Sequence, residues 1–314
     1  MAKYLITGGC GFIGSHLADA LVARGDQVRV LDDLSTGRRE NLPDGVELMV
    51  GDVSDTVRVR QAVEGTDGCW HLAAIASVAR SNEEWLTTHR VNQTGSIAIF
   101  EAARTAGRGK NPIPVVYASS AAVYGDTTEL PLGEHATTRP LTAYGADKLG
   151  TELHARVATR VHGVPTVGFR FFNVFGRRQD PRSPYSGVIS IFAGKILQRQ
   201  PITIFGDGEQ TRDFVHVRDV IHFLLAGMER GGDNPLIYNV CTGRQTSLNQ
   251  LVQLMFRVVG YPVPMRFAPP RPGDIRHSLG DPAMAARELE LVASHDMAPG
   301  LGELLAFLSS EQCP

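Results

Sequence analysis

The sequence predicts an α/β protein with a doubly wound parallel sheet, followed by a smaller C-terminal α/β domain. In the first half, short β-branched runs alternate with longer amphipathic segments, which is typical of βαβ units. A glycine-rich turn follows the first run, as in nucleotide-binding sheets. After about Gly176 the chain becomes richer in Gly and Pro. We expect residues 1–176 to bind a nucleotide and residues 177–314 to bind the substrate, with 236–242 returning to the main sheet.

The first half is expected to contain six strands joined by helical crossovers. The helices show apolar residues at helical spacing, whereas the strands are short runs bounded by Gly, Asp or polar residues. Strands are predicted at 4–7, 27–32, 46–50, 68–72, 115–118 and 166–171, and helices at 12–24, 57–64, 84–106 and 143–162.

Composition restricts the class of protein. Of 314 residues, 43% are hydrophobic and 20% charged, a globular balance that excludes a disordered chain. The net charge of −2, from mixed basic and acidic residues, favours neither nucleic acid nor an anionic membrane as partner. No apolar run approaches the ~20 residues that span a bilayer, and the start does not resemble a signal peptide. We expect a cytoplasmic protein without a metal site, since its 4 cysteines lack metal-ligand spacing.

Three glycines mark a dinucleotide site directly after the first strand. Gly8 permits a tight turn, Gly11 lets the backbone approach a pyrophosphate, and Gly14 lets helix and strand pack closely. The phosphates would lie at the helix N-terminus, at Phe12 and Ile13. Because the motif lies between a strand and a helix, it predicts a Rossmann sheet.

The end of the second strand favours NAD over NADP. Asp32 and Asp33 can accept hydrogen bonds from ribose hydroxyls and would repel a 2′-phosphate. Arg38 and Arg39 leave open the alternative that an arginine reaches such a phosphate. After the third strand, Asp52 and Val53 lie where the adenine edge is expected. The alternative is that Asp52 and Val53, together with Ser54, form a helix N-cap region.

Tyr144 and Lys148 are the candidate catalytic pair. Their i, i+4 spacing places them on one face of a helix, where an ammonium and an oxidised nicotinamide lower a tyrosine pKa. This spacing alone also fits two ordinary surface residues. The fifth strand, however, ends in Ser119 and Ser120, which places a hydroxyl at the same carboxyl edge of the sheet. Together they predict an acid–base site.

These motifs resemble the extended short-chain dehydrogenase/reductases, most closely the UDP-hexose 4-epimerases, and among them those of UDP-N-acetylglucosamine. The resemblance covers nearly the whole chain. Besides the glycines, the serine pair and Tyr144/Lys148, its markers are the segments 31–37, 71–74, 91–92, 170–176 and 212–217.

The resemblance implies an NAD-dependent enzyme that inverts C4 of a UDP-hexose through a 4-keto intermediate, acting as a homodimer through a four-helix bundle from 84–106 and 143–162. Tyr144 would be the base, Lys148 would bind the nicotinamide ribose, and Ser120 would bind the sugar 4′-hydroxyl. Further cofactor contacts would come from Ser35, Gly37, Leu72, Ala73 and Ala74. The substrate would be bound by Val78, Asn173, Val188, Phe205, Arg212, Arg271, Asp274 and Ser278.

Within that set, Asn173, Arg212 and Arg271 are expected at the pyrophosphate, Phe205 on the uracil and Asp274 at the uridine ribose. The alternative for Arg212 is an ion pair with Asp213 or Asp219. Ser278 would form the wall beside the sugar's C2 substituent, where a small residue accompanies acceptance of N-acetyl sugars. The alternative is a polar strand-edge residue away from the pocket.

Related dehydratases and decarboxylases carry an acidic residue just after the catalytic hydroxyl. Here Ala121, Ala122 and Val123 follow Ser120, so elimination lacks its acid–base group. A UDP-glucuronate 4-epimerase, a reductase that consumes NADH and a non-catalytic NAD-binding relative remain as alternatives.

Overall fold

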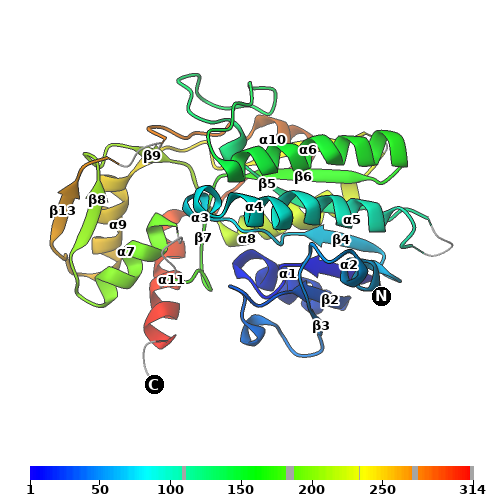
Figure 1. Ribbon diagram of the computed structural model, residues 1–314. Coiled ribbons are helices and arrows are strands. Elements are labelled where there is room, and N and C mark those ends of the chain that lie inside the picture. The colour runs from blue at the N-terminus through cyan, green and yellow to red at the C-terminus, as the bar shows by residue number, and fades with distance from the viewer. Residues whose placement is uncertain (108–110, 182–186, 233, 271–274, 312–314) are drawn as a thin grey trace.

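A seven-stranded parallel sheet forms the centre of the protein in the computed structural model, which describes residues 1–107, 111–181, 187–232, 234–270 and 275–311 (Figure 1). The strands are β1 (Lys3–Thr7), β2 (Gln27–Asp32), β3 (Glu47–Val50), β4 (Gly68–His71), β5 (Val115–Ser120), β6 (Thr166–Phe171) and β11 (Leu236–Val240). Their order is β11-β6-β5-β4-β1-β2-β3. The predicted doubly wound parallel sheet is confirmed.

The strand order reverses between β1 and β4. From β1 the chain proceeds outward through β2 to β3, and then crosses back to β4 and proceeds the other way to β5 and β6. In sheets of this kind, ligands bind outside the carboxyl ends of the strands at the point of reversal. The turns after β1 and β4 therefore meet where a ligand is expected.

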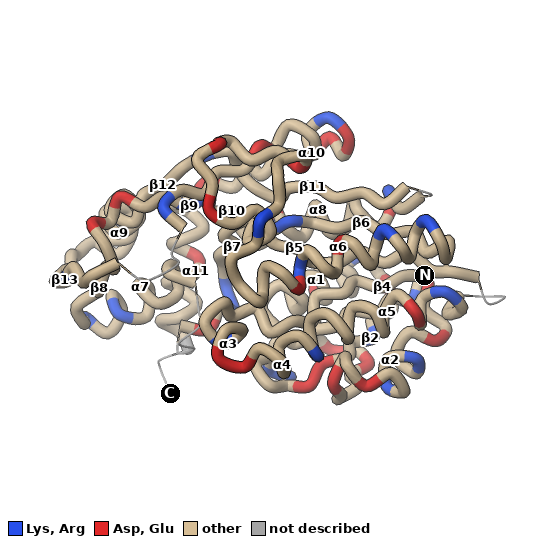
Figure 2. The backbone as a smooth tube through the Cα atoms, turned by 45° about the horizontal axis from the view of Figure 1, so that its top comes forward, with Lys and Arg blue, Asp and Glu red and all other residues tan. Residues whose placement is uncertain are grey.

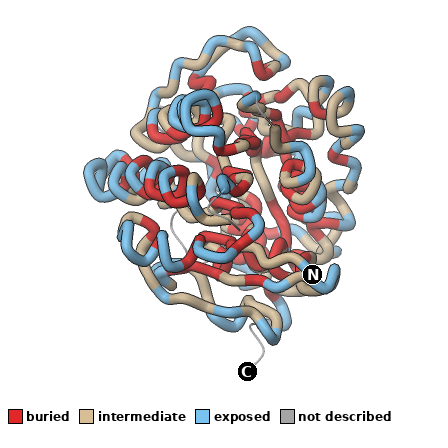
Figure 3. The backbone as a smooth tube through the Cα atoms, turned by 90° about the vertical axis from the view of Figure 1, so that its right-hand side faces the viewer, coloured by how far each residue is buried: buried red, intermediate tan, exposed pale blue. Residues whose placement is uncertain are grey.

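Helices cover both faces of the sheet. On one face lie α1 (Phe12–Ala23) and α8 (Val217–Arg230), and on the other α2 (Thr56–Val63), α5 (Gly95–Ala103) and α6 (Ala143–His162). Leu5 and Ile6 are adjacent on β1 and both fully buried, Leu5 against the α2 side and Ile6 against the α1 side. Such two-sided burial explains why the strands are continuous apolar runs. Figure 3 shows the buried strands between helices with exposed outer faces.

The helix expected over 84–106 is divided. It consists of α4 (Trp85–His89), a π-helical turn at Arg90–Thr94, and α5. Inside that turn the Asn92 side chain binds the backbone of Ile75, with Oδ1 accepting from Ile75 N at 2.8 Å and Nδ2 donating to Ile75 O at 3.1 Å. π turns are frequent at functional sites. A short helix, α3 (Val78–Glu83), precedes α4.

The smaller part of the molecule has its own apolar core. It contains β8 (Ile202–Phe205) paired with β13 (Met265–Ala268), and α7 (Val188–Leu197), α9 (Leu248–Val259) and α11 (Met297–Glu311). Phe192, Ile196, Leu251, Met255 and Leu304 are buried together between these elements. In Figure 1 this part lies to the left of the large sheet.

Short strand pairs join the two parts. They are β7 (Asn173–Phe175) with β10 (Phe214–His216), and β9 (Thr211–Arg212) with β12 (Thr246–Ser247). Beyond residue 176, both α8 and β11 pack with the large sheet, and α10 (Ala283–Glu288) contacts β11. The chain thus returns to the sheet with more than the predicted segment 236–242, and the boundary at 176 stays a prediction.

Basic and acidic residues lie interspersed along the described parts of the chain (Figure 2). Among the described residues, no helix combines the length and the apolar character needed to cross a membrane.

Candidate active site

The glycine turn after β1 is fixed by close backbone contacts. Gly8 has φ +70°, and a Cβ there would lie 2.8 Å from Ala73 Cα. A Cβ on Gly14 would overlap the carbonyl oxygen of Gly8. Gly11 is the N-cap of α1 and has no side chain that could cap it, so the first N–H groups of the helix, at Phe12 and Ile13, are left for another acceptor. These features fit the diphosphate of a dinucleotide.

The Asp32 carboxylate connects this turn to the end of β2. Its Oδ2 accepts from Cys10 N and its Oδ1 from Leu34 N, both at 2.9 Å. Burial raises the pKa of Asp32, and these two N–H donors oppose the rise. Asp33 next to it is exposed and accepts from Ser35 N at 2.9 Å and Ser35 Oγ at 2.6 Å. Each carboxylate oxygen can accept a second bond, so both groups keep the capacity to bind ribose hydroxyls.

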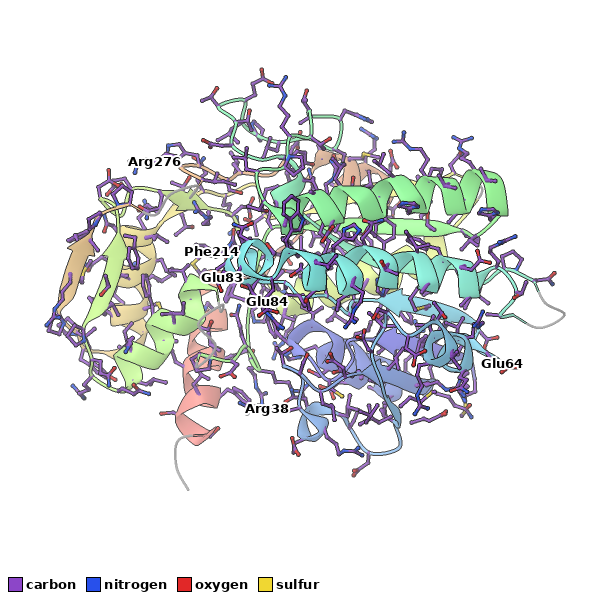
Figure 4. The ribbon with its side chains drawn as sticks, in the orientation of Figure 1. Arg38, Glu64, Glu83, Glu84, Phe214 and Arg276 are labelled. Carbon is purple, nitrogen blue, oxygen red and sulfur yellow. The ribbon has the colours of Figure 1, made fainter. Side chains whose placement is uncertain are left out.

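The segment 37–41 folds back onto the glycine turn. A Cβ on Gly37 would lie 2.8 Å from Cys10 Cβ, and Arg38 N donates to Cys10 O at 3.0 Å. The Arg38 guanidinium lies 3.5 Å from the Asp180 carboxylate, on the edge of the large part that faces the smaller part (Figure 4). This arginine therefore already has an acidic partner.

Asp52 and Val53 follow β3. The N-cap of α2 is Asp55, which accepts from Val57 N at 2.9 Å and Arg58 N at 3.2 Å, so the capping role does not belong to Asp52. Asp52 accepts from Ser54 N at 2.8 Å. Val53 is buried. The alternative of a capping function for Asp52 is thereby disfavoured.

The loop after β4 carries Leu72, Ala73 and Ala74. Ala73 N donates to Thr7 Oγ1 at 3.2 Å, while Ile75 is held on both sides by the buried Asn92. The sequence predicted no role for Asn92. The one available signal was that it belongs to a marker segment of the resemblance.

Tyr144, Lys148 and Ser120 come together at the carboxyl edge of β5. Lys148 Nζ donates to Ala118 O at 2.8 Å and lies 5.7 Å from the centre of the Tyr144 ring. Ser120 hydrogen-bonds the Tyr144 hydroxyl and accepts from Ala122 N at 3.1 Å. The grouping predicted for these three residues is therefore present.

The start of α6 is fixed on α3, which positions Tyr144. Thr142 caps the helix by accepting from Gly145 N at 3.1 Å. Tyr144 N donates to Ser81 Oγ at 3.2 Å, and Ser81 Oγ donates to Val78 O at 2.7 Å. The sequence predicted no role for Ser81.

Burial dominates the electrostatics of the catalytic group. It raises the pKa of Tyr144, and the hydrogen bond from Ser120 opposes this rise. Burial also lowers the pKa of Lys148 to about 8. In the protein alone, the pKa of Tyr144 is thus shifted upward, not downward as the sequence predicts for the loaded site. Ionisation of the phenol needs further positive charge, which an oxidised nicotinamide would supply.

On the substrate side, Asn173 begins β7 and Arg212 ends β9, directly before Asp213. Asn173 N donates to Asp213 O at 3.0 Å, and Arg212 Nη1 donates to Thr211 O at 2.8 Å. The Asp213 carboxylate accepts from Thr242, Gly243 and Gly280. Asp219 binds His295 Nδ1 at 2.6 Å. Both proposed acidic partners of Arg212 are therefore engaged elsewhere.

The remaining predicted contacts lie at the ends of elements. Val188 begins α7, Phe205 ends β8, and the exposed Val78 begins α3. Ser278 is 9% exposed, and its N–H donates to Thr211 O at 3.2 Å, which places it beside the segment that carries Arg212. Arg271 and Asp274 lie outside the described residues.

A stability test follows from the buried charge. Below pH 8 Lys148 is protonated in both the folded and unfolded states, so folding carries the full burial cost. Between its folded pKa of about 8 and its unfolded value the unfolded state binds more protons, and stability rises with pH. Burial of the Lys148 charge lowers the free energy of unfolding by about 3 kcal/mol at neutral pH, and the hydrogen bond to Ala118 O offsets about 1 kcal/mol of this loss.

In dinucleotide-free protein, Lys148→Met should therefore raise the free energy of unfolding by about 2 kcal/mol at pH 7, with the gain shrinking above pH 8. Urea unfolding at several pH values measures this. Lys195 is exposed, so Lys195→Met should give no such gain. A loss of stability in Lys148→Met would contradict the burial argument.

Comparison with known proteins agrees with this geometry. Residues 4–241 match the model of the NAD-dependent epimerase/dehydratase family. The UDP-glucose 4-epimerase of Mycolicibacterium smegmatis is 36% identical over 317 aligned positions, covering 98% of this chain and 99% of that protein.

Two solved structures are similar over 99% of this chain: the UDP-N-acetylglucosamine 4-epimerase of Methanobrevibacter ruminantium in complex with UDP-N-acetylmuramic acid, and the UDP-glucose 4-epimerase of Thermus thermophilus in complex with NAD. Their TM-scores are 0.93 and 0.89, their identities 33% and 32%, and 99% and 100% of those chains are covered. From this match and the glycine turn, serine, tyrosine and lysine described above, it follows that the chain belongs to the NAD-dependent epimerase/dehydratase family.

Proposed function

We propose that the protein is an NAD-dependent UDP-hexose 4-epimerase, acting on the N-acetylglucosamine/N-acetylgalactosamine pair and on the glucose/galactose pair. The observation that carries the proposal is the grouping of Tyr144, Ser120 and Lys148 at the edge of β5. The similarity to characterised 4-epimerases over nearly the full chain supports it.

In the proposed reaction, Tyr144 as phenolate removes the proton of the 4-hydroxyl, which Ser120 orients by a hydrogen bond. Bound NAD⁺ supplies the acceptor for the hydride that leaves C4 and later returns to it. Lys148 holds the nicotinamide ribose, and its charge stabilises the phenolate. The resulting 4-keto sugar rotates and presents its opposite face. Tyr144 returns the proton to the oxygen, and the hydride returns to C4 from that face, which inverts the configuration at C4.

This sequence of steps needs a firmly held nucleotide and a loosely held sugar. We assign the first task to Asn173, Arg212 and Arg271 at the diphosphate and to Phe205 at the uracil, with Val78 and Val188 lining the site. Arginine suits a diphosphate because its planar charged fork makes paired hydrogen bonds. Binding energy from the non-reacting UDP then retains the keto sugar while it turns.

The turn after Ser120 argues against dehydration. It is the short 3₁₀ turn Ala121–Val123, whose side chains are apolar. Elimination across C5 and C6 requires an acid–base group at this place. The proposal therefore favours epimerisation over a dehydratase reaction on the same scaffold.

The hydride cycle gives the decisive experiment. With substrate deuterated at C4 and no added reductant, the label should remain in the epimerised product. Tyr144→Phe should fold and keep NAD but lose at least ~100-fold in turnover, the scale of a lost acid–base group. Tyr261→Phe is the matched control, because the Tyr261 hydroxyl donates to Ile196 O within the smaller part. Loss of the label to free NADH would indicate a reductase, and near-normal turnover of Tyr144→Phe would remove this residue from the mechanism.

Ser278 provides a test of substrate size. A small side chain at a nearly buried position leaves space beside C2 of the sugar, which an acetamido group would need. Ser278→Tyr should suppress turnover of the acetylated pair and largely spare the smaller pair, since filling a pocket penalises the ligand that used the space. Ser278→Ala, which keeps the space, should preserve the ratio. Equal loss on both pairs would refute the size argument and leave the 4-epimerase proposal intact.

We also propose a homodimer through α4, α5 and α6. On α6, Leu153, Val157 and Val161 follow one another at i, i+4 spacing with 52%, 45% and 69% exposure. Trp85 and Leu86 on α4 are 68% and 82% exposed. Because α4 packs against α6, these residues can contribute to one apolar surface, and a second copy would bury it.

Val157→Glu should convert the dimer to a monomer in sedimentation velocity, because it places a charge in the centre of the contact. Val292→Glu is the control, since Val292 is 59% exposed and lies outside these helices. A wild-type monomer, or dimers in both variants, would refute this interface.

We further infer a cytoplasmic location. Cys10, Cys69 and Cys241 are buried free thiols, and burial raises the pKa of each. Such thiols fit a reducing compartment. Cell fractionation tests this.

A further inference from the structure

A chain of buried polar side chains joins the loop after β4 to helices α5 and α6. Its members are Thr7, His71, Ser96 and Thr151, each 3% exposed or less. Thr7 Oγ1 lies 2.8 Å from His71 Nδ1, and His71 Nε2 lies 3.0 Å from Ser96 Oγ. The proposed reaction assigns no role to these residues.

The hydroxyl of Ser96 determines which ring nitrogen of His71 carries the proton. Ser96 Oγ donates its only proton to Asn92 O at 2.5 Å. It must therefore act as acceptor toward His71, so His71 Nε2 is the protonated nitrogen. Thr151 is compatible with this, because its hydroxyl donates to Asp147 O at 3.0 Å as well as lying 3.2 Å from Ser96.

The other end of the chain follows from the same accounting. In neutral imidazole, a protonated Nε2 leaves Nδ1 as an acceptor, and the Thr7 hydroxyl donates to it. The Thr7 oxygen then has a lone pair for the N–H of Ala73, at 3.2 Å. The hydrogen bonds thus run in one direction, from Ala73 through Thr7, His71 and Ser96 to Asn92.

Both ends of this chain act on one loop. Ala73 is held directly by Thr7. Ile75 is held by the side chain of Asn92, and the backbone carbonyl oxygen of Asn92 is the last acceptor in the chain of hydrogen bonds. Ala73 is also the residue that leaves no space for a Cβ on Gly8. The position of the loop therefore determines the shape of the surface where β1 and β4 meet.

The imidazole stays neutral at all pH values at which the enzyme would work. Burial, together with the nearby charge of Lys148, lowers the pKa of His71 to about 3. Protonation would also place a second donor at Nδ1, facing the Thr7 hydroxyl, and Thr7 would have to turn from donor to acceptor there while it also accepts from Ala73 N. His71 is therefore suited to a fixed structure and unsuited to proton transfer.

We propose that His71 is a positioning residue for cofactor binding: its neutral Nε2–H tautomer locks the loop 72–75 against α5 and α6, so that the loop and Lys148 present one preformed surface to the dinucleotide. This inference rests on the proposed cofactor role of Leu72, Ala73 and Ala74. It extends the site to a group that touches neither cofactor nor substrate.

The tautomer is tested directly by ¹⁵N NMR of protein labelled in its histidines, independently of turnover. For His71 we expect a protonated Nε2, an unprotonated Nδ1, and signals that do not change between pH 5 and 8. Thr7→Val should perturb the Nδ1 signal and thereby assign it. The opposite tautomer, or a titration within this range, would overturn the proposal even if epimerase activity were fully established.

The effect on the cofactor is tested by measuring NAD affinity. Thr7→Val leaves Ala73 N–H and His71 Nδ1 without their partner and should raise the Kd for NAD about tenfold, equivalent to about 1.4 kcal/mol, with the KM for the UDP-sugar unchanged. Thr7→Ser should restore the affinity. His71→Gln should have a similar effect, and the double variant should be little worse than either single one, because both break the same chain.

The matched control is Thr159→Val. Thr159 lies on α6, the helix that carries Lys148, and its Oγ1 makes a buried hydrogen bond of 2.7 Å with Thr166 Oγ1 on β6. The substitution should lower thermal stability without changing NAD affinity. If Thr7→Val and Thr159→Val lost equal stability and both kept their NAD affinity, the hydrogen-bonded side chains would serve only the stability of the core. The positioning role would then be refuted.

Discussion

The site depends on the contact of three backbone segments with no side chain between them. The end of β1 at Gly8, the first turn of α1 at Gly14 and the loop at Ala73 approach so closely that a Cβ has no space at either glycine. This contact brings a helix N-terminus to the reversal point of the sheet, where its N–H groups can hold phosphate. It also determines where the other end of a dinucleotide can lie, and hence which residues at the edge of β5 can act on it.

Around this contact, buried carboxylates are satisfied by the backbone. Asp32 binds the N–H groups of two turns at the cofactor side, and Asp213 binds N–H groups of two segments, Thr242–Gly243 and Gly280, at the substrate side. A buried carboxylate with backbone donors fixes several loops at once, because each oxygen accepts more than one bond. At these two points backbone N–H groups, and not basic side chains, hold the loops, which suits a protein whose proposed ligand carries two phosphates.

Much of the fold and the centre of the site could be predicted from the sequence, since both depend on local patterns. Strands buried on both faces are continuous apolar runs, and the end of such a strand locates Ser120, while i, i+4 spacing aligns Tyr144 and Lys148. The π turn could not be predicted, because it depends on the contact of Asn92 with Ile75, 17 residues away. Strands of two or three residues, such as β9 and β10, are too short to show a period. The upward shift of the Tyr144 pKa depends on burial, which only the tertiary structure determines.

The segment 177–180, which leads from the large sheet to the smaller part, is fastened along α1 by polar contacts. His16 Nε2 lies 3.0 Å from Arg177 O, Arg178 binds Asp19 at 2.7 Å, and Asp180 lies 3.5 Å from Arg38. Such contacts contribute little net stability and re-form easily, unlike an apolar core. Along this segment, contacts with water can replace these hydrogen bonds and ion pairs. The cofactor site and the segment that leads away from it are thus held in different ways: close backbone contact fixes the first at Gly8, Gly14 and Ala73, and ion pairs that can exchange with water hold the second.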